Sequence, residues 1–123
     1  MHTSYPPVVL IVEDEPFILL DVAESISQAG FKVIEAVTAD RALQIIEQGQ
    51  KVDAIFTDIN MPGDIDGLGL ASVVSVRWPE IGLVITSGKV RDVTGLPAGT
   101  IFLEKPYLPE SVVSAIHDTI RIL

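Results

Sequence analysis

Five residues in the sequence carry the functional groups that phosphoryl-transfer chemistry needs. They are three carboxylates, a hydroxyl and an ammonium group, on Glu13, Asp14, Asp58, Thr86 and Lys105. Gathered in one place, the carboxylates would repel one another, because two unit charges about 4 Å apart cost roughly 4 kcal/mol at an effective dielectric constant near 20. A divalent cation relieves this repulsion, and a ligand set made of oxygens favours Mg²⁺, Mn²⁺ or Ca²⁺ over zinc or copper.

One of these carboxylates can also act as a nucleophile, because an aspartate can carry a phosphoryl group as an aspartyl phosphate. The transfer depends mainly on positioning and on neutralising the equatorial oxygens of the phosphoryl group. Lys105 would supply a positive charge for one of these oxygens, and Thr86 a hydroxyl for a second. The cation would take the third.

The five residues have similar places in the chain, because each follows or ends a segment with the pattern of a buried β-strand. Residues 8–12 form a continuous apolar run that stops at Glu13, and shorter apolar runs stop at Asp58, at Thr86 and just before Lys105. Apolar residues at helical spacing fill the intervals between these runs. The expected strands are residues 8–12, 31–36, 54–57, 83–85 and 101–103, and the expected helices are residues 16 to about 30, 38–48, 66–77 and 109–120.

Strands that alternate with helices predict an α/β fold, a three-layer sandwich in which helices cover both faces of a parallel sheet. In such an open sheet the carboxyl ends of the strands share one edge, and ligands bind there. We therefore expect residues that are far apart in the sequence, from Glu13 to Lys105, to converge in one crevice.

The composition limits the classes of function. A formal net charge of −9 argues against nucleic acid or an anionic membrane as a direct partner. The absence of cysteine excludes disulfides and thiolate metal sites, and no apolar run is long enough for a spanning helix. The first residues also lack the basic region of a signal peptide. We expect a cytoplasmic protein, with residues 1–7 as an N-terminal extension and residues 8–123 as one domain.

Four short motifs give the chain a wider resemblance. They are residues 12–15 (VEDE), 57–63 (TDINMPG), 85–87 (ITS) and 104–107 (EKPY). Each motif alone is weak, but their order and their positions after strands are jointly specific. On these motifs, the chain resembles a response-regulator receiver domain of two-component signalling from end to end, in the form of a single-domain response regulator with no output domain.

The resemblance implies a flavodoxin-like receiver fold with strand order 2-1-3-4-5 and a phosphoacceptor function in a phosphorelay. A histidine kinase or a histidine phosphotransfer protein would donate the phosphoryl group, and an unidentified downstream protein would receive the signal by contact or by phosphoryl shuttling. The protein would be a switch rather than an enzyme, although it would assist its own phosphotransfer and autodephosphorylation. It would be a monomer or a weak homodimer.

The resemblance also implies a role for each site residue. Asp58 would be the phosphoacceptor, Thr86 the switch hydroxyl and Lys105 the partner of the phosphoryl group. The implied ligands of Mg²⁺, with Mn²⁺ as an alternative, are Glu13, Asp14, Asp58 and the backbone carbonyl of Asn60. The implied accessory residues are Phe102 as the switch aromatic, Pro106 as the residue that fixes the loop after the lysine, and Asn60 and Gly88 as residues that tune autodephosphorylation.

The sequence departs from the family's usual pattern in three places. Glu13 stands where an aspartate is commoner, and the loop 61–67 is one residue longer than usual. The stretch between Thr86 and the last strand is short and contains three glycines and a proline, and glycine costs roughly 1 kcal/mol in a helix interior relative to alanine. We therefore expect the fourth helix of the usual fold to be a turn or two around residues 90–94, or absent.

Two other functions remain open on the sequence alone. A pseudo-receiver, which is an interaction module that is never phosphorylated, would have lost an acid, the threonine or the lysine. A metal-dependent phosphatase with an aspartyl nucleophile would carry Asp-x-Asp after its first strand, whereas Asp58 follows the third strand and is followed by Ile59 and Asn60. Phe102 could equally be an ordinary core residue.

Overall fold

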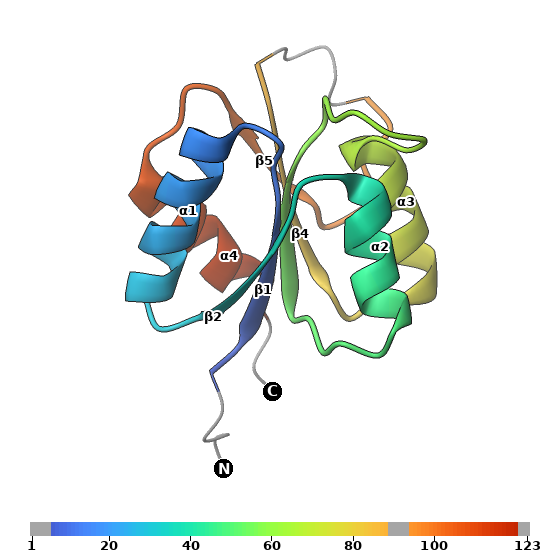
Figure 1. The fold of residues 1–123 in the computed structure, drawn as a ribbon, viewed down its shortest axis with the longest axis horizontal. Helices are drawn as coiled ribbons and strands as arrows, with labels where there is room; N and C mark the ends of the chain where they lie inside the picture. The colour runs from blue at the N-terminus through green and yellow to red at the C-terminus, as the bar shows by residue number, and fades with distance from the viewer. Residues whose placement is uncertain (1–5, 89–93, 121–123) are drawn as a thin grey trace.

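A five-stranded parallel sheet forms the middle layer of the protein (Figure 1). The computed structural model describes residues 6–88 and 94–120. The strand order β2-β1-β3-β4-β5 is the one that the family resemblance predicted. The strands are β1 (Val8–Val12), β2 (Lys32–Ala36), β3 (Ala54–Asp58), β4 (Gly82–Ser87) and β5 (Ile101–Glu104).

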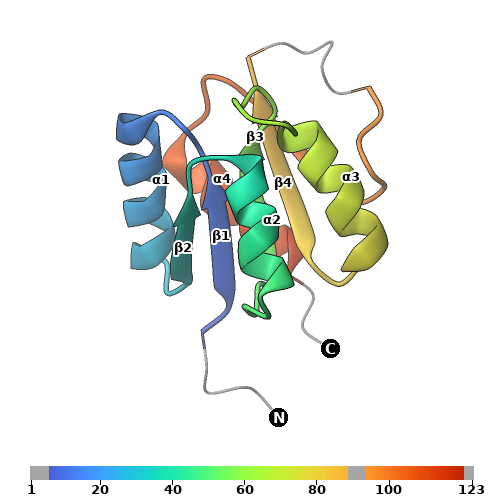
Figure 2. The same cartoon turned by 45° about the vertical axis from the view of Figure 1, so that its right-hand side comes forward.

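Helices cover both faces of the sheet, so the predicted three-layer α/β architecture is confirmed (Figure 1). Two helices pack side by side on each face, as Figure 2 shows for the face that carries the middle two helices of the chain. One face carries α1 (Pro16–Gln28) and α4 (Pro109–Thr119), and the other carries α2 (Ala39–Glu47) and α3 (Gly67–Arg77).

The apolar runs of the sequence are explained by burial on both faces of the sheet. In β1, Val9 and Ile11 pack toward α1 and α4, whereas Leu10 and Val12 pack toward α2 and α3. All four side chains are fully buried. A central strand of a parallel sheet has no solvated face, so its sequence is continuously apolar rather than alternating.

Local capping fixes where the helices begin. The Thr38 hydroxyl accepts the Arg41 N–H at 3.0 Å at the start of α2, and an Asp66 carboxylate oxygen accepts the Gly69 N–H at 2.8 Å at the start of α3. Pro16 occupies the first turn of α1, where its missing N–H costs nothing. The capping residue of α1 is Glu15, whose carboxylate accepts the Phe17 N–H at 3.2 Å.

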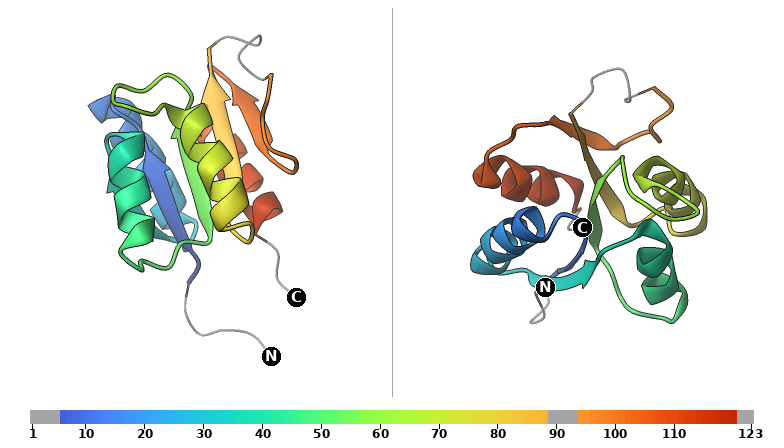
Figure 3. Two further views of the ribbon diagram at one scale, coloured as in Figure 1. Left: turned by 90° about the vertical axis from the view of Figure 1, so that its right-hand side faces the viewer. Right: turned by 45° about the horizontal axis from the view of Figure 1, so that its top comes forward.

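The carboxyl ends of the strands lie along one edge of the sheet, and the connections that follow β1, β3 and β5 leave from it (Figure 1; Figure 3 turns this edge toward the viewer on the right). Across this edge Val12 pairs with Thr57, Asp58 with Thr86, and Ser87 with Glu104. We call this the carboxyl edge. At the opposite, amino edge, β1 begins and α4 ends (Figure 1).

The helix expected around residues 90–94 falls almost entirely outside the described residues, which stop at Gly88 and resume at Thr94. Residues 94–100 contain no helix and lead directly into β5. No helix among residues 6–88 and 94–120 is long and apolar enough to cross a bilayer.

Candidate functional site

Asp58 and Lys105 form an ion pair at the carboxyl edge. Asp58 is the last residue of β3 and is only 6% exposed, and Lys105 directly follows β5. The Lys105 ammonium donates to Asp58 Oδ2 with an Nζ–Oδ2 distance of 2.6 Å. The two residues are 47 positions apart in the sequence, and β4 lies between their strands. The convergence expected from the strand endings is therefore present for this pair.

The second oxygen of the same carboxylate is also held. Asp58 Oδ1 accepts the backbone N–H of Asn60 at 3.3 Å. The backbone of Asp58 is fixed as well, because α3 begins against it: a Cβ built on Gly67 would overlap the Asp58 carbonyl oxygen. The Gly67 N–H donates to the Ile59 carbonyl at 2.9 Å. The carboxylate of Asp58 thus has a defined orientation on a rigid support.

Thr86 lies beside Asp58 on β4 as its register partner. Its side chain is fully buried, and its hydroxyl has no hydrogen-bond partner among the described residues. Leaving a buried hydroxyl unpaired costs about 1–3 kcal/mol, so native proteins keep few of them. An oxygen atom placed next to Asp58 would give this hydroxyl its missing acceptor.

Glu13 is a buried acid on the other side of Asp58. It is 1% exposed, its Oε2 accepts the Glu15 N–H at 3.0 Å, and its Oε1 has no partner among the described residues. Burial raises the pKa of the Glu13 carboxyl above 4.5, and the negative charge of Asp58 raises it further, against the lowering effects of the Glu15 N–H and of Lys105. An ionised Glu13 is therefore poorly stabilised by the protein alone.

Asp14 is exposed, and the interaction of its side chain with Glu13 is a further cause of the raised pKa of Glu13. Within residues 6–88 and 94–120 there is no group of three or more His, Cys, Asp or Glu side chains arranged to hold a metal ion. The structure brings Glu13, Asp58, Thr86 and Lys105 together, and it leaves Asp14 at the rim.

Comparison with known proteins decides the family. The sequence pattern of the response regulator receiver domain matches residues 9–117. The chain belongs to this receiver-domain family.

Relatives and solved structures agree with this assignment. Transcriptional regulatory protein AruR of Pseudomonas aeruginosa is 31% identical over 94% of this chain and 50% of AruR. Sensor kinase CckA of Brucella abortus is 30% identical over 92% of this chain and 12% of CckA. A response regulator receiver protein of Sinorhizobium medicae superimposes with a TM-score of 0.88 at 26% identity, over 96% of this chain and 97% of that one. The chain thus spans half or less of these two sequence relatives.

Receiver domains of two-component systems are phosphoacceptor switches that generally depend on Mg²⁺, and the donor groups of this receiver domain fit that ion. Mg²⁺ uses one or two carboxylates and keeps several waters. Glu13 offers a buried oxygen without a partner, Asp58 offers a carboxylate beside it, and the turn at Asn60 follows directly. Such a site does not need three converging carboxylates. Asp14, at the rim, could add a contact through water.

The structure shows the surroundings of three of the accessory residues that the resemblance implied. Phe102 is half-buried on β5 and packs with the core under α2 and α3, next to Ile85 of β4. The peptide bond between Lys105 and Pro106 is cis. Gly88 is exposed, and a Cβ built on it would meet no atom of the described residues within 4 Å. The approach to Asp58 from this side is not blocked by residue 88.

Two residues near the site were not recognised from the sequence as more than packing or surface residues. Tyr107 contacts Phe56 edge-on, with ring centroids 5.8 Å apart, and burial together with the charges of Glu13, Asp58 and Asp21 raises its pKa to about 12. Asp40, at the start of α2, accepts a hydrogen bond from the loop that follows β3. The unusual length of that loop was the only signal in the sequence that it needs a separate support.

Proposed function

We propose that Asp58 is the phosphoacceptor of this receiver domain and that it takes a phosphoryl group from a histidine kinase or a histidine phosphotransfer protein. The observation that carries the proposal is the environment of Asp58, with the Lys105 ammonium on one oxygen and the unpartnered Thr86 hydroxyl on the neighbouring strand. An anionic group bonded to Asp58 would satisfy both.

In the proposed transfer, a carboxylate oxygen of Asp58 attacks the phosphorus of the phosphohistidine. The oxygen–phosphorus bond forms as the nitrogen–phosphorus bond breaks, and the imidazole leaves with the electron pair of that bond. Bound Mg²⁺ would neutralise charge on the phosphoryl oxygens, with Glu13, Asp58 and the Asn60 carbonyl as its protein ligands and Asp14 at its rim. Mn²⁺ has the same preference for oxygen ligands and could replace it.

Lys105 and Thr86 would bind oxygens of the transferred phosphoryl group. The ammonium must leave the Asp58 carboxylate for a phosphoryl oxygen, and the hydroxyl must turn toward another oxygen. Because both groups sit at the ends of neighbouring strands, β4 and β5, their movement would alter the segment that connects these strands. Phe102 lies on β5 within this region and would respond to the same movement.

The protein that donates the phosphoryl group would dock beside Lys105. A groove of about 590 Å³ runs between α1 and the loop after β5, and Phe17, Ile18, Pro106 and Tyr107 supply much of its wall. Phe17 is 81% exposed, although phenylalanine is among the residues most often buried in folded proteins. Since Lys105 also lines this groove, a helix placed on it would bring a phosphohistidine within reach of Asp58.

The phosphoryl group would be lost again by autodephosphorylation. Gly88 offers no side chain to shield the aspartyl phosphate, and the exposed Asn60 could orient an attacking water. We propose a lifetime of minutes rather than days. We also propose that residues 8–123 form the receiver domain after an N-terminal extension of residues 1–7, that it works in the cytoplasm, and that it is a monomer or a weak homodimer.

Mass spectrometry of the intact protein after incubation with acetyl phosphate and Mg²⁺ tests the main proposal. We expect a mass gain of one phosphoryl group that is absent in Asp58→Asn. A protein that gains no mass from acetyl phosphate or from any kinase would be a pseudo-receiver. Steady hydrolysis of phosphate esters would instead indicate the phosphatase function.

A further inference from the structure

The loop between β3 and α3 carries Asn60, whose carbonyl is a proposed metal ligand. The outer part of this loop is held by a side chain of α2. Asp40 Oδ2, in the first turn of α2, accepts the Asp64 N–H at 3.0 Å. This hydrogen bond joins two segments that are 24 residues apart. A carboxylate that accepts a backbone N–H makes one of the stronger types of hydrogen bond.

The preceding residue of the loop packs against the same carboxylate. Gly63 has a φ of +119°, a region that favours glycine, and a Cβ built on it would overlap Asp40 Oδ2. The loop therefore meets Asp40 at two successive residues, once through a hydrogen bond and once through direct backbone contact.

The two ends of the loop are fixed by other contacts. At the start, the Asn60 N–H donates to Asp58, and at the end Asp66 caps α3. Met61 and Ile65 are partly buried against the core under α2 and α3. Residues 62–64 between them are exposed. Among the described residues, the bond from the Asp64 N–H to Asp40 is the one hydrogen bond found between residues 62–64 and another element.

We propose that Asp40 is a positioning residue for the metal-binding side of the site. Asp40 would act by holding the outer part of the loop that carries Asn60, so that the Asn60 carbonyl, a proposed ligand, keeps a fixed position. This inference rests on the proposed function. It also predicts that Gly63 is needed for the same reason, because any side chain there would displace the Asp40 carboxylate.

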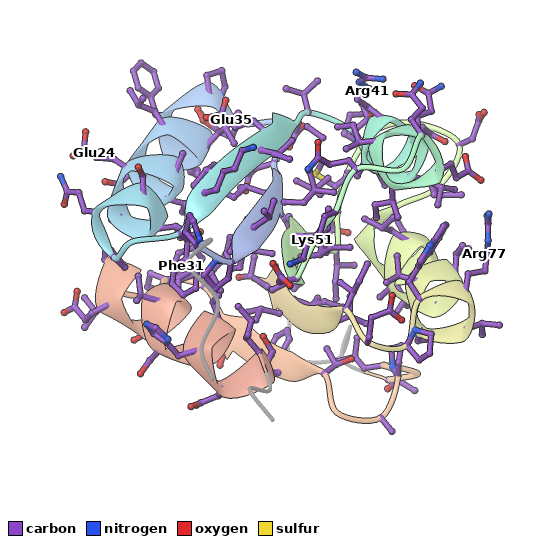
Figure 4. All side chains as sticks on the ribbon, turned by 90° about the horizontal axis from the view of Figure 1, so that it is seen from below. Glu24, Phe31, Glu35, Arg41, Lys51 and Arg77 are labelled. Atoms are coloured by element: carbon purple, nitrogen blue, oxygen red, sulfur yellow. The ribbon has the colours of Figure 1, made fainter. Side chains whose placement is uncertain are left out.

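A simpler role for Asp40 is stabilisation of α2, since an acidic residue in the first turn interacts favourably with the helix dipole. Two control variants separate these roles. Thr38→Ala removes the cap of the same helix end without touching the loop. Glu47→Ala removes the 2.8 Å ion pair to Arg77, which joins α2 to α3 at the far end of both helices; Figure 4, seen from the amino edge, shows Arg77 pointing outward there.

The experiment combines two measurements on the whole chain. Hydrogen exchange of residues 60–66 without metal reports the order of the loop, and the dissociation constant of Mg²⁺ is obtained from thermal shifts across a Mg²⁺ titration. For Asp40→Ala we expect faster exchange in the loop and a Mg²⁺ dissociation constant raised about tenfold, the lower end of the range for residues that orient metal ligands. Asp40→Asn keeps an oxygen acceptor and should retain most of the affinity.

A double-mutant cycle sharpens the test, because residues in contact give non-additive effects. Gly63→Ala should weaken Mg²⁺ binding in the presence of Asp40 and cause less additional loss in Asp40→Ala, where the overlapping carboxylate is gone. If Thr38→Ala raises the dissociation constant as much as Asp40→Ala does, or if loop exchange is unchanged in Asp40→Ala, the inference is wrong. A wild-type protein that binds no Mg²⁺ would refute the proposed metal site, and loop exchange would still show whether Asp40 holds the loop.

Discussion

Thr86 and Asp58 are register partners at the carboxyl ends of β4 and β3, so the unpartnered Thr86 hydroxyl and the Asp58 carboxylate are carried by neighbouring strands. Neighbouring strands lie about 4.8 Å apart, so a phosphoryl oxygen on Asp58 would lie close to the Thr86 hydroxyl. Packing of both strands in the core makes this spacing difficult to change.

Substitutions at Asp58, Thr86 and Lys105 should distinguish phosphorylation of the protein from its conformational response. Asp58→Asn should abolish phosphorylation by acetyl phosphate. Thr86→Val and Lys105→Ala should still be partly phosphorylated but lose the conformational response, because Thr86 and Lys105 are proposed to bind the phosphoryl oxygens. Thr86→Val should also leave stability unchanged or higher, since it removes an unpaired hydroxyl at constant volume. Intact mass and thermal melting measure these effects, and full labelling of Asp58→Asn would place the acceptor elsewhere.

Mg²⁺ should stabilise the unphosphorylated protein by relieving the repulsion between Glu13 and Asp58. At ten to a hundred times its dissociation constant the gain is about 1.4–2.7 kcal/mol, or on the order of 4–10 °C in melting temperature. Glu13→Gln should raise the metal-free stability, because it removes a buried charge, and should reduce the Mg²⁺ effect. Asp14→Asn changes the exposed acidic neighbour of Glu13 and should alter both the metal-free stability and the Mg²⁺ effect less than Glu13→Gln does. A melting temperature that is the same with and without millimolar Mg²⁺ would argue against the metal site.

The groove beside Lys105 should affect the rate of phosphotransfer from a protein donor but not from a small-molecule donor. Phe17→Ala should slow phosphotransfer from a phosphorylated histidine phosphotransfer protein and leave the rate with acetyl phosphate unchanged. Val76→Ala is the control, because Val76 is equally exposed, at 80%, but lies on α3 across the sheet. Equal rates for the two variants with the protein donor would show that docking occurs on another surface.

Tyr107 gives a pH dependence with a definite sign. Its pKa is raised from 10.0 to about 12, chiefly by burial, so the folded protein holds the phenolic proton more tightly than the unfolded chain. The folded state is therefore favoured below pH 10, and this contribution is lost as the pH rises from about 10 to about 12. Chemical denaturation across this range should show a steeper loss of stability in the wild type than in Tyr107→Phe. Parallel curves would mean that the phenol is not shielded.

Phosphorylation should order the connection between β4 and β5. Thr86 lies near the end of β4, so its movement acts directly on residues 88–99, part of which lies outside the described residues. The described part, residues 94–99, contains no regular secondary structure. Hydrogen exchange with and without beryllofluoride should show increased protection in residues 88–99. Strong protection there before modification, or a change confined to other regions, would contradict this prediction.

The sequence predicted those parts of the site that depend on topology. Because parallel strands end at one edge, the meeting of Asp58 with Lys105 followed from where their strands stop, and the 2.6 Å ion pair bears this out. The different surroundings of Glu13 and Asp14 were not predicted, because both lie beyond the end of β1, where strand alternation no longer fixes side-chain direction. The contact of Asp40 with the loop was missed because it depends on the backbone path of one unusual turn.

The start of β1 and the end of α4 both lie at the amino edge, whereas Asp58 lies at the carboxyl edge, at the other ends of the strands. Chain ends that lie together on the surface let a domain be inserted into, or appended to, another polypeptide with little remodelling. This geometry makes the domain portable, because a flanking segment at either end would attach at the amino edge and leave the carboxyl edge, where Asp58 lies, unobstructed. Such portability is consistent with receiver-like segments that occupy 50% of AruR and 12% of CckA.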